Sequence, residues 1–466
     1  MLRNLYIAAL EPSSGKSLVL LGIMELLSKR VQKLGFFRPV IHSGAQPDND
    51  IELVRSRYHL DFAYESQYAL TRDEVRQLVA DGKFDDLLKQ VIAKYKALER
   101  QCDFVVCEGI NPSDIDPALV DNFDTRVAKH LSAPILVVAN GFDKTPMEVV
   151  NAARTEREAY LEEGCAIVAT IVNRVELAEI DTVRELLHQV WTFDDPVYVV
   201  PDEPILSKPT IAEITKALNA HLLHGDGERL NREVQSVKVA AMQVPNFLSR
   251  ITEGSLIITP SDRADVILGC LASAFSDNYP TIAGMVLTGG LELPPSLLKL
   301  IEGVNRWTIP VLSVESDTFE TATKVNSVRA EISPENDLKI ASALGVFESN
   351  VDGAKLAEQI AVSRSDRITP IMFEYELIER ARAVKQHIVL PEGKDERILR
   401  ATEILLRRGV VDITLLGNEL EIREAIARFG LNLDGVEIID PLQSNWQENY
   451  AQTYYELRKH KGITED

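Results

Sequence analysis

The sequence is short of basic residues. Its 50 Lys and Arg residues face 71 Asp and Glu residues, so the formal net charge is −21 at pH 7. Repulsion from phosphate groups makes a nucleic acid or an anionic membrane an unfavourable partner, although local amide groups can still hold a small anionic ligand. We therefore expect small-molecule ligands, with no nucleic acid and no membrane partner.

Cysteine is also scarce. The four cysteines lie far apart or in apolar segments, and no pair has the spacing of a zinc site or a redox motif. We expect reduced thiols in the core at all four positions, which are Cys102, Cys107, Cys165 and Cys270.

Several other signatures are missing. The N-terminus has no basic segment followed by an apolar stretch and a cleavage site, and no apolar run reaches membrane-spanning length. A cytoplasmic protein is therefore expected. The chain has no Gly-x-Ser-x-Gly or His-Glu-x-x-His motif. His42, beside Ser43 and Gly44, is the only histidine near a candidate site, and we interpret it as polar lining at best.

What the first 220 residues do contain is an alternation of short β-branched runs with helical patterns. This alternation is typical of a mostly parallel sheet covered on both faces by helices. Amphipathic patterns over Asp73–Leu98 and Pro146–Glu163 predict two of the helices. The expected strands are Leu5–Leu10, Leu34–Val40, Phe104–Cys107, Ile135–Ala139, Ala166–Val172 and Val197–Val200.

Two further α/β segments follow. Polar residues around His224–Arg229 predict a linker to a second small α/β unit, and Glu348–Asp366 predicts another linker to a third. The third segment has a helix over Glu374–Lys385 and one βαβ pattern, which does not close a sheet. The domain boundaries we expect are 1–223, 230–347 and 367–466. The second unit's expected strands are Val239–Met242, Ser255–Thr259, Ile282–Leu287 and Ile309–Val314.

A partial phosphate-binding loop lies between the first strand and the first helix. Gly15, Lys16 and Ser17 supply small backbone, a cation and a hydroxyl, which are the parts that hold a phosphate and its Mg²⁺. Leu10 stands where the strict motif has its first glycine. The Gly-Lys-Ser sequence alone is a weak signal, and a structural turn is an equal alternative.

Residues after the other strands give this loop a context. Arg38 ends the second strand, Asp50 follows it, Glu108 ends the third, and Asn173 ends the fifth. This succession resembles dethiobiotin synthetase and its P-loop relatives, whose loosened loop has its first glycine displaced by one position. That position is Ala9 in this chain.

The resemblance implies a role for each matching residue. Lys16 would contact the phosphate, with Gly15, Ser17, Arg38 and Asn173 completing the nucleotide or anion site. Ser17, Asp50 and Glu108 would be Mg²⁺ ligands, and Asn173 would read the nucleotide base. The substrate-binding lysine of the synthetase is Arg38 here, so we expect an anion site that regulates and does not ligate. An empty retained fold and an active ATP-dependent ligase are the alternatives.

The second unit carries Ser261-Asp262-Arg263-Ala264-Asp265 after one strand and Thr288-Gly289-Gly290 after another. These segments resemble the DRTGG domain, which implies a regulatory or assembly role. Tight turns with Asp262 as a helix N-cap are the plainer interpretation, and no chemistry is assigned to this unit.

The order of the three pieces resembles the long form of phosphate acetyltransferase. The matching segments in the third unit include Thr369–Phe373, His387–Arg397, Leu415–Asn418 and Glu456–Gly462. The resemblance implies the reaction of acetyl-CoA and phosphate to acetyl phosphate and CoA, by direct acyl transfer in a ternary complex. Glu392 and Arg397 lie at a strand-to-helix turn, where capping or surface roles are expected.

Most catalytic residues of that family are expected beyond residue 466. The catalytic site residues are thus unknown, and we expect a truncated catalytic domain that is inactive in this chain and a homo-oligomeric assembly. The alternative is a stand-alone nucleotide- or metabolite-binding regulatory protein of the P-loop class.

Overall fold

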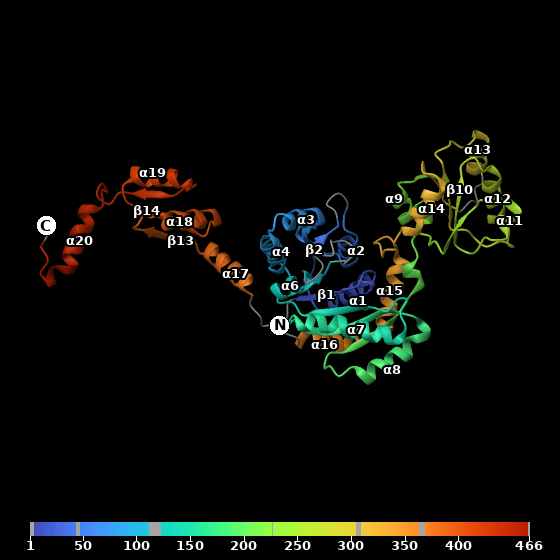
Figure 1. The fold of residues 1–466 in the computed structure, drawn as a ribbon, viewed down its shortest axis with the longest axis horizontal. Coiled ribbons are helices and arrows are strands. Elements are labelled where there is room, and N and C mark those ends of the chain that lie inside the picture. Colours follow the sequence, from blue (N-terminus) through green and yellow to red (C-terminus); the bar gives the residue numbers. More distant parts are fainter. Residues whose placement is uncertain are drawn as a thin grey trace. The chain divides into compact units, whose positions relative to one another are not determined.

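The computed structural model describes residues 4–42, 47–110, 123–225, 227–303, 309–362 and 369–464. Ser43 and Gly44, noted beside His42, lie outside these ranges. The chain divides into two compact units, residues 1–367 and 368–466, which are described separately (Figure 1).

A seven-stranded, fully parallel sheet forms the centre of the first unit, which confirms the predicted α/β class. Its strand order is β3-β2-β4-β1-β5-β6-β7. Six of these strands correspond to the predicted ones, whereas the four-residue edge strand β3 was not predicted. The strands are β1 (Asn4–Ala8), β2 (Leu34–Ile41), β3 (Tyr68–Thr71), β4 (Phe104–Glu108), β5 (Ile135–Asn140), β6 (Ile167–Val175) and β7 (Val197–Pro201).

Strand β1 lies between β4 and β5, and this position locates the candidate site. Ile7 pairs with Glu108 of β4, while Ala8 pairs with Val137 of β5. Because all seven strands are parallel, their carboxyl ends meet at one edge of the sheet. The loop after β1 therefore lies between the ends of β4 and β5, and the end of β2 lies one strand beyond β4.

Helices cover both faces of this sheet. Helices α1, α15 and α16 share a buried apolar cluster on one face, and α7 and α8 pack on β5, β6 and β7 in another cluster. The helices are α1 (Lys16–Ser28), α2 (Asn49–Tyr58), α3 (Arg72–Ala80), α4 (Phe84–Glu99), α6 (Phe123–His130), α7 (Pro146–Glu162), α8 (Ile180–Val190), α15 (Asp337–Asn350) and α16 (Gly353–Val362). Short 3-10 turns are η1 (Tyr64–Ser66), η2 (Leu177–Glu179) and η3 (Pro204–Ser207).

The single helix expected over Asp73–Leu98 is two helices. Helix α3 begins with a capping box between Thr71 and Glu74, and α4 begins at Phe84. Gly82 has a φ of 70° between them, in the left-handed region that glycine adopts readily. The amphipathic pattern continues across this break, which is why periodicity alone did not reveal it.

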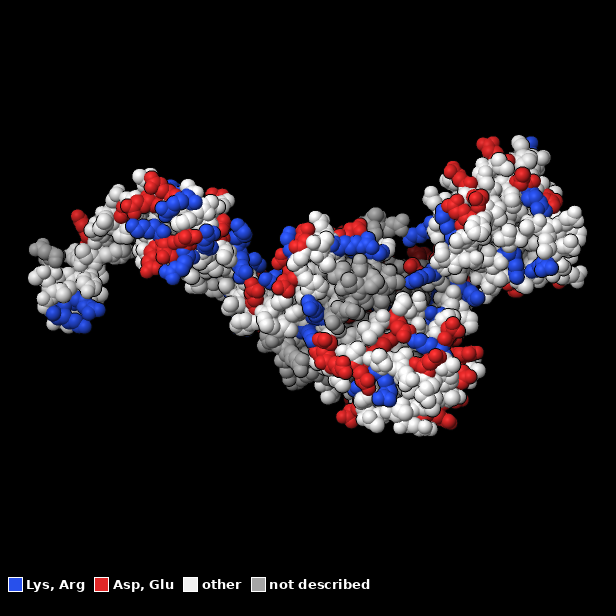
Figure 2. Space-filling model, in the orientation of Figure 1, with Lys and Arg blue, Asp and Glu red and all other residues white. Residues whose placement is uncertain are grey.

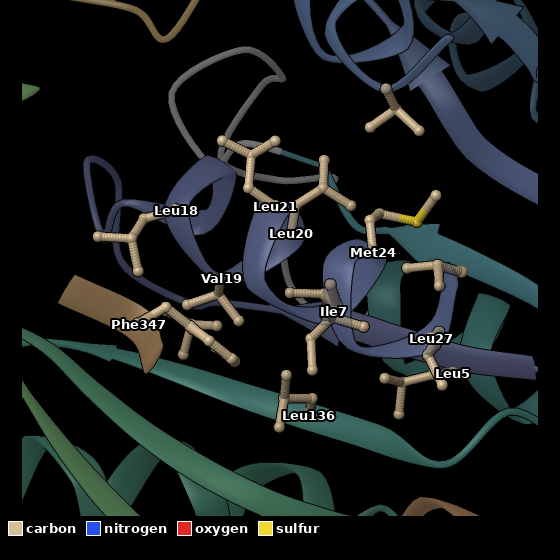
Figure 3. Close-up of a cluster of buried hydrophobic side chains, with 14 of the residues drawn as sticks. Leu5, Ile7, Leu18, Val19, Leu20, Leu21, Met24, Leu27, Leu136 and Phe347 are labelled. Carbon is tan, nitrogen blue, oxygen red and sulfur yellow. The ribbon is translucent and has the colours of Figure 1, made fainter. Parts of the chain in front are cut away.

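Residues 337–362 return to the first sheet. The sequence divided them between the second domain and a polar linker, but α15 packs against α1, and α16 contacts β6. Figure 3 shows Val19 of α1 gathered with Ile7 and Leu136 of the sheet and with Phe347 of α15. Apolar packing against α1 therefore sets the position of this segment.

The chain between β7 and α15 forms a second sheet. Its order is β8-β12-β11-β10-β9, with β8 antiparallel at one edge and the rest parallel. Helices α11, α12 and α13 share one apolar cluster with it, and α9 and α14 share another. The elements are β8 (His221–His224), β9 (Ser236–Val239), β10 (Ser255–Pro260), β11 (Gly284–Thr288), β12 (Val311–Ser313), α9 (Ile211–Leu218), α10 (Gly227–Leu230), α11 (Val244–Leu248), α12 (Ala264–Ala274), α13 (Pro295–Gly303) and α14 (Thr318–Ser327).

The second compact unit holds a parallel three-stranded sheet of order β13-β14-β15. The expected βαβ pattern is present, with a helix over Glu396–Arg408 between two paired parallel strands. The elements are α17 (Pro370–Ala383), β13 (Gln386–Leu390), α18 (Glu396–Arg408), β14 (Val411–Leu416), α19 (Glu419–Phe429), β15 (Glu437–Ile439), α20 (Gln447–Arg458) and the 3-10 turn η4 (Lys459–Lys461).

Gly22 on α1 tests the packing of α15. A Cβ atom at Gly22 would lie 2.2 Å from the Phe347 ring, whereas one at Gly345, on α15 itself, would meet no described atom within 4 Å. We expect Gly22→Ala to lower the free energy of unfolding by about 1–3 kcal/mol, because overpacking displaces the helix. Gly345→Ala should be neutral or should stabilise by up to ~1 kcal/mol. Urea denaturation measures both, and equal effects of the two changes would contradict the packing described.

Candidate functional site

The loop between β1 and α1 forms one wall of a cavity of about 890 Å³. Ser13 and Gly15 have φ angles of 57° and 76°, so the backbone turns sharply into the helix. Helix α1 begins at Lys16 with no side-chain cap and no acidic residue in its first turn. Its first N–H groups are therefore available to an anion, as in phosphate-binding loops.

Leu10 does not obstruct this loop. Its side chain is 38% exposed, and it is not among the residues that line the cavity. Ala9, at the displaced glycine position, is buried in the core beneath the loop. The departure from the strict motif thus leaves the phosphate-binding half of the loop open.

Gly15 is required by the close approach of β6. The Asn173 amide nitrogen donates to the carbonyl oxygens of Ser14 at 2.8 Å and Gly15 at 3.2 Å. A Cβ atom at Gly15 would lie 2.3 Å from that nitrogen. Asn173 is 1% exposed, and its Oδ1 atom has no hydrogen-bond partner among the residues that the structure describes. An acceptor is therefore left over beside the loop, where a ligand donor can satisfy it.

Lys16 is 4% exposed and lies under the loop. Its Nζ donates to the carbonyl oxygens of Gly109 at 2.6 Å and Ile110 at 2.7 Å, just past β4. Burial lowers the pKa of Lys16, and the nearby carboxyl groups of Glu108 and Asp124 act in the opposite direction. The ammonium group thus faces the end of β4 from below the loop.

Arg38 of β2 gathers three acidic side chains. Its Nη1 lies 2.6 Å from Asp48 and 3.3 Å from Asp50, and its Nε lies 3.4 Å from Glu108. The Ser17 hydroxyl donates to the other Asp50 oxygen at 3.0 Å. Arg38 and all three residues that were expected to bind Mg²⁺ (Ser17, Asp50 and Glu108) therefore lie in one cluster at the sheet edge.

Burial shifts the acidity of this cluster. It raises the pKa of Glu108 to about 8, with Asp50 adding to the rise and Arg38 and Lys16 opposing it. Burial also raises the pKa of Asp50, against the attraction of Arg38. Clustered groups with shifted pKa values are typical of functional sites, although structural ion networks produce them too.

The outer wall of the cavity comes from two other segments. Pro201–Glu203, Leu206 and Ser207 line it after β7, and Val328–Ile332 line it ahead of α15. Arg174 donates to the Ser13 carbonyl oxygen at 2.8 Å and to Asp202 at 2.9 Å, so it joins the loop to this wall. Asn49 of α2 donates to the Ile332 carbonyl oxygen at 3.0 Å.

All seven residues assigned from the sequence line this cavity, and so does His42, whose side chain is exposed. Their assigned roles stay predictions. Four residues of the site and its support, Asp48, Arg174, Asp124 and Glu331, were not assigned from the sequence. Asp48 and Arg174 were neighbours of assigned residues, which was the available signal. Glu331 lies far along the chain, and nothing in its local sequence indicated this cavity.

Asp124 supports the site from behind. It accepts hydrogen bonds from the Tyr6 hydroxyl at 2.8 Å and from the Ile110 backbone N–H at 3.1 Å. A Cβ atom at Gly109 would lie 2.4 Å from its carboxylate. This contact fixes the two carbonyl groups that Lys16 uses.

In the second sheet, the turn before α12 differs from the prediction. Asp262 is not the N-cap, because α12 begins at Ala264 with Arg263 as its N-cap residue and with no side-chain cap. Arg263 pairs with Asp265 at 2.8 Å, and the Asp262 carbonyl oxygen accepts the Ala264 N–H. Ser261 donates to the Thr288 carbonyl oxygen at 2.9 Å, so these turns bond to one another.

In the third sheet, Arg397 and Glu392 are exposed. Asp395 caps α18, accepting from the N–H groups of Arg397 and Ile398, and the Arg397 side chain pairs with Asp395 at 3.3 Å. The expected surface positions of Glu392 and Arg397 are confirmed, whereas the expected capping role belongs to Asp395.

The described residues contain no group of three or more His, Cys, Asp or Glu side chains placed to hold a metal ion. Among the helices that the structure describes, none has both the length and the apolar character needed to cross a membrane. The face in view in Figure 2 carries acidic and basic side chains intermixed.

The pKa of Glu108 makes stability depend on pH. In the unfolded chain this carboxyl ionises near its ordinary pKa of 4.5, whereas the folded protein holds the proton up to about pH 8. Its contribution to the free energy of unfolding therefore falls as the pH rises from about 5 to 8. Glu108→Gln should remove this dependence, becoming more stable than the wild type by roughly one to a few kcal/mol at pH 8 and by less at pH 5.

Denaturation at several pH values measures this difference. The matched control is Glu176→Gln, at an exposed position, which should leave the pH profile unchanged. A Glu108→Gln profile parallel to that of the wild type would contradict a raised pKa.

Three segments of the chain match the models of known protein families. The family model described as "AAA domain" matches residues 3–220, that of the DRTGG domain matches 213–328, and that of phosphate acetyl/butaryl transferase matches 372–466. The first, second and third sheets each fall within one match, whereas α15 and α16 lie between the second match and the third. We call the first sheet with its helices the P-loop lobe and the second sheet with its helices the DRTGG lobe. The order of the three is the order expected from the sequence.

Curated relatives match along the whole chain. A phosphate acetyltransferase of Nitratidesulfovibrio vulgaris is 42% identical over 470 residues, covering 100% of this chain and 67% of that protein. One of Synechocystis is 36% identical, with the same coverage, and one of Escherichia coli is 28% identical, covering 97% of this chain and 66% of that protein. This chain spans about two thirds of the length of these relatives. It belongs to the phosphate acetyltransferase family, in the long form that carries a P-loop domain and a DRTGG domain ahead of the transferase domain.

Proposed function

We propose that the P-loop lobe of this phosphate acetyltransferase binds a phosphate-bearing ligand, a nucleotide by resemblance, and serves regulation. The observation that carries the proposal is the cavity at the uncapped start of α1, with buried Lys16 beneath it. The Oδ1 of Asn173, which no described residue bonds, adds an acceptor at the same loop. A built site of this kind, in a family defined by another reaction, is best explained by an effector.

The reaction of the family interconverts acetyl-CoA and phosphate with acetyl phosphate and CoA, and we assign it to the transferase domain. Within the part of that domain that the structure describes, Glu392 and Arg397 lie on the surface. Val389, on the edge strand β13, is 53% exposed. CoA, acetyl-CoA, phosphate and acetyl phosphate are the small molecules involved. Homo-oligomerisation and a cytoplasmic location stay predictions from the sequence.

Lys16→Met tests the ligand site. The change keeps the buried stem but removes the ammonium group, and hydrogen bonds to a charged group contribute about 1.5–3 kcal/mol. We expect ATP or ADP to bind at least about tenfold more weakly, since ~1.4 kcal/mol corresponds to a factor of ten. Isothermal titration calorimetry measures this.

The control for Lys16→Met is Lys33→Ala, which removes an exposed lysine from the turn before β2 and should leave binding unchanged. Thermal melting of both variants checks that they are folded. Unaltered nucleotide binding in a folded Lys16→Met protein would contradict the proposed site.

The 466-residue polypeptide should show no acetyl transfer. In the described part of its transferase domain Glu392 and Arg397 are exposed, and the chain spans about two thirds of the length of its relatives. Acetyl-CoA formation from acetyl phosphate and CoA measures the activity. Turnover that scales with the concentration of purified polypeptide would overturn this expectation.

A further inference from the structure

Three acidic side chains of the P-loop cavity, beside the phosphate-binding loop, face one internal cation. Arg38 is 6% exposed, and its guanidinium faces Asp48, Asp50 and Glu108 at 2.6 to 3.4 Å. These three carboxyl groups come from α2, from the residue before it and from the end of β4. The cation that lies among them is therefore part of the chain itself.

The predicted Mg²⁺ ligands do not form a metal site in this arrangement. Mg²⁺ requires oxygen ligands at about 2.0–2.1 Å in octahedral geometry. One oxygen of Asp50 accepts from Ser17, its other oxygen faces Arg38, and the Glu108 Oε2 faces the Arg38 Nε. Two of the carboxyl oxygens that a divalent ion would use, one of Asp50 and one of Glu108, are thus directed at a guanidinium group, and an ion added there would lie next to that charge.

Arg38 is also held in place by a partner that is itself fixed. Asp48 is the N-cap of α2, where its side chain accepts the Ile51 N–H at 3.2 Å, and its own backbone N–H donates to the Tyr64 hydroxyl at 2.7 Å. Moving Arg38 out would leave Asp48 buried without its counter-ion. Breaking a buried ion pair in this way is strongly unfavourable.

We propose that Arg38 is the resident cation of this cavity, and that the P-loop takes up its phosphate-bearing ligand as the metal-free anion. The proposal rests on the proposed function for the class of ligand. A guanidinium group offers several N–H donors in a planar fork that suits phosphate oxygens, whereas a divalent ion would have to arrive with the ligand or before it. Lys16 and the first amides of α1 complete the set of donors.

The first test measures metal binding without any nucleotide. Mn²⁺, followed by electron paramagnetic resonance, is titrated into the wild type, Arg38→Gln and the control Arg30→Gln, which changes an exposed arginine. We expect no saturable binding to the wild type or the control. Arg38→Gln should gain a site, with affinity raised at least tenfold, because Asp48, Asp50 and Glu108 are released. Mn²⁺ binding to the wild type that is lost in Asp50→Asn would overturn the proposal.

The second test needs only the wild type. Calorimetry with ATP is carried out in excess EDTA and in excess Mg²⁺, and we expect dissociation constants within about threefold of each other. Binding that is tenfold or more tighter with Mg²⁺ would overturn the proposal. Absence of ATP binding under both conditions would count against the proposed function instead, and the Mn²⁺ titration alone would then decide whether Arg38 holds the cation position.

Discussion

The P-loop lobe depends on mutual compensation of buried charges at the carboxyl edge of its sheet. Lys16 and Arg38 are both almost fully buried, and so are Asp50 and Glu108. A buried charge is tolerated only when paired and hydrogen-bonded, so each member constrains the others. The strand order β2-β4-β1 brings them together, because Arg38, Glu108 and Lys16 belong to three neighbouring strands or the loops that follow them.

Much of this arrangement could be predicted from local sequence. Near-continuous apolar runs such as Ile135–Asn140 are typical of a doubly covered parallel sheet, and six of seven strands followed from them. The seven assigned site residues line one cavity because the carboxyl ends of parallel strands share an edge. The family resemblance added the order of the lobes, which the comparisons confirm.

What could not be predicted depends on contacts far apart in the sequence. The packing of α15 on α1 joins Phe347 to a helix more than 300 positions earlier, and no periodicity carries that information. The contacts of Arg38 could not be predicted for the same reason. Its residue type was noted, but which carboxyl groups it meets depends on how β2, β4 and α2 are placed. The predicted helix cap at Asp262 was wrong. Asp262 has a residue type common at N-caps, but α12 begins one residue later, where Arg263 and Asp265 pair with each other.

The return of α15 and α16 to the first sheet makes the DRTGG lobe an insertion within the P-loop lobe. The chain leaves through Pro201–Ser207 and comes back through Val328–Ile332, and both connections line the cavity at the loop. A ligand that fills this cavity therefore contacts the outgoing and the returning connection at once. A rotation of the inserted lobe has to bend both connections, so ligand occupancy of the cavity and the orientation of the lobe are coupled at this one place.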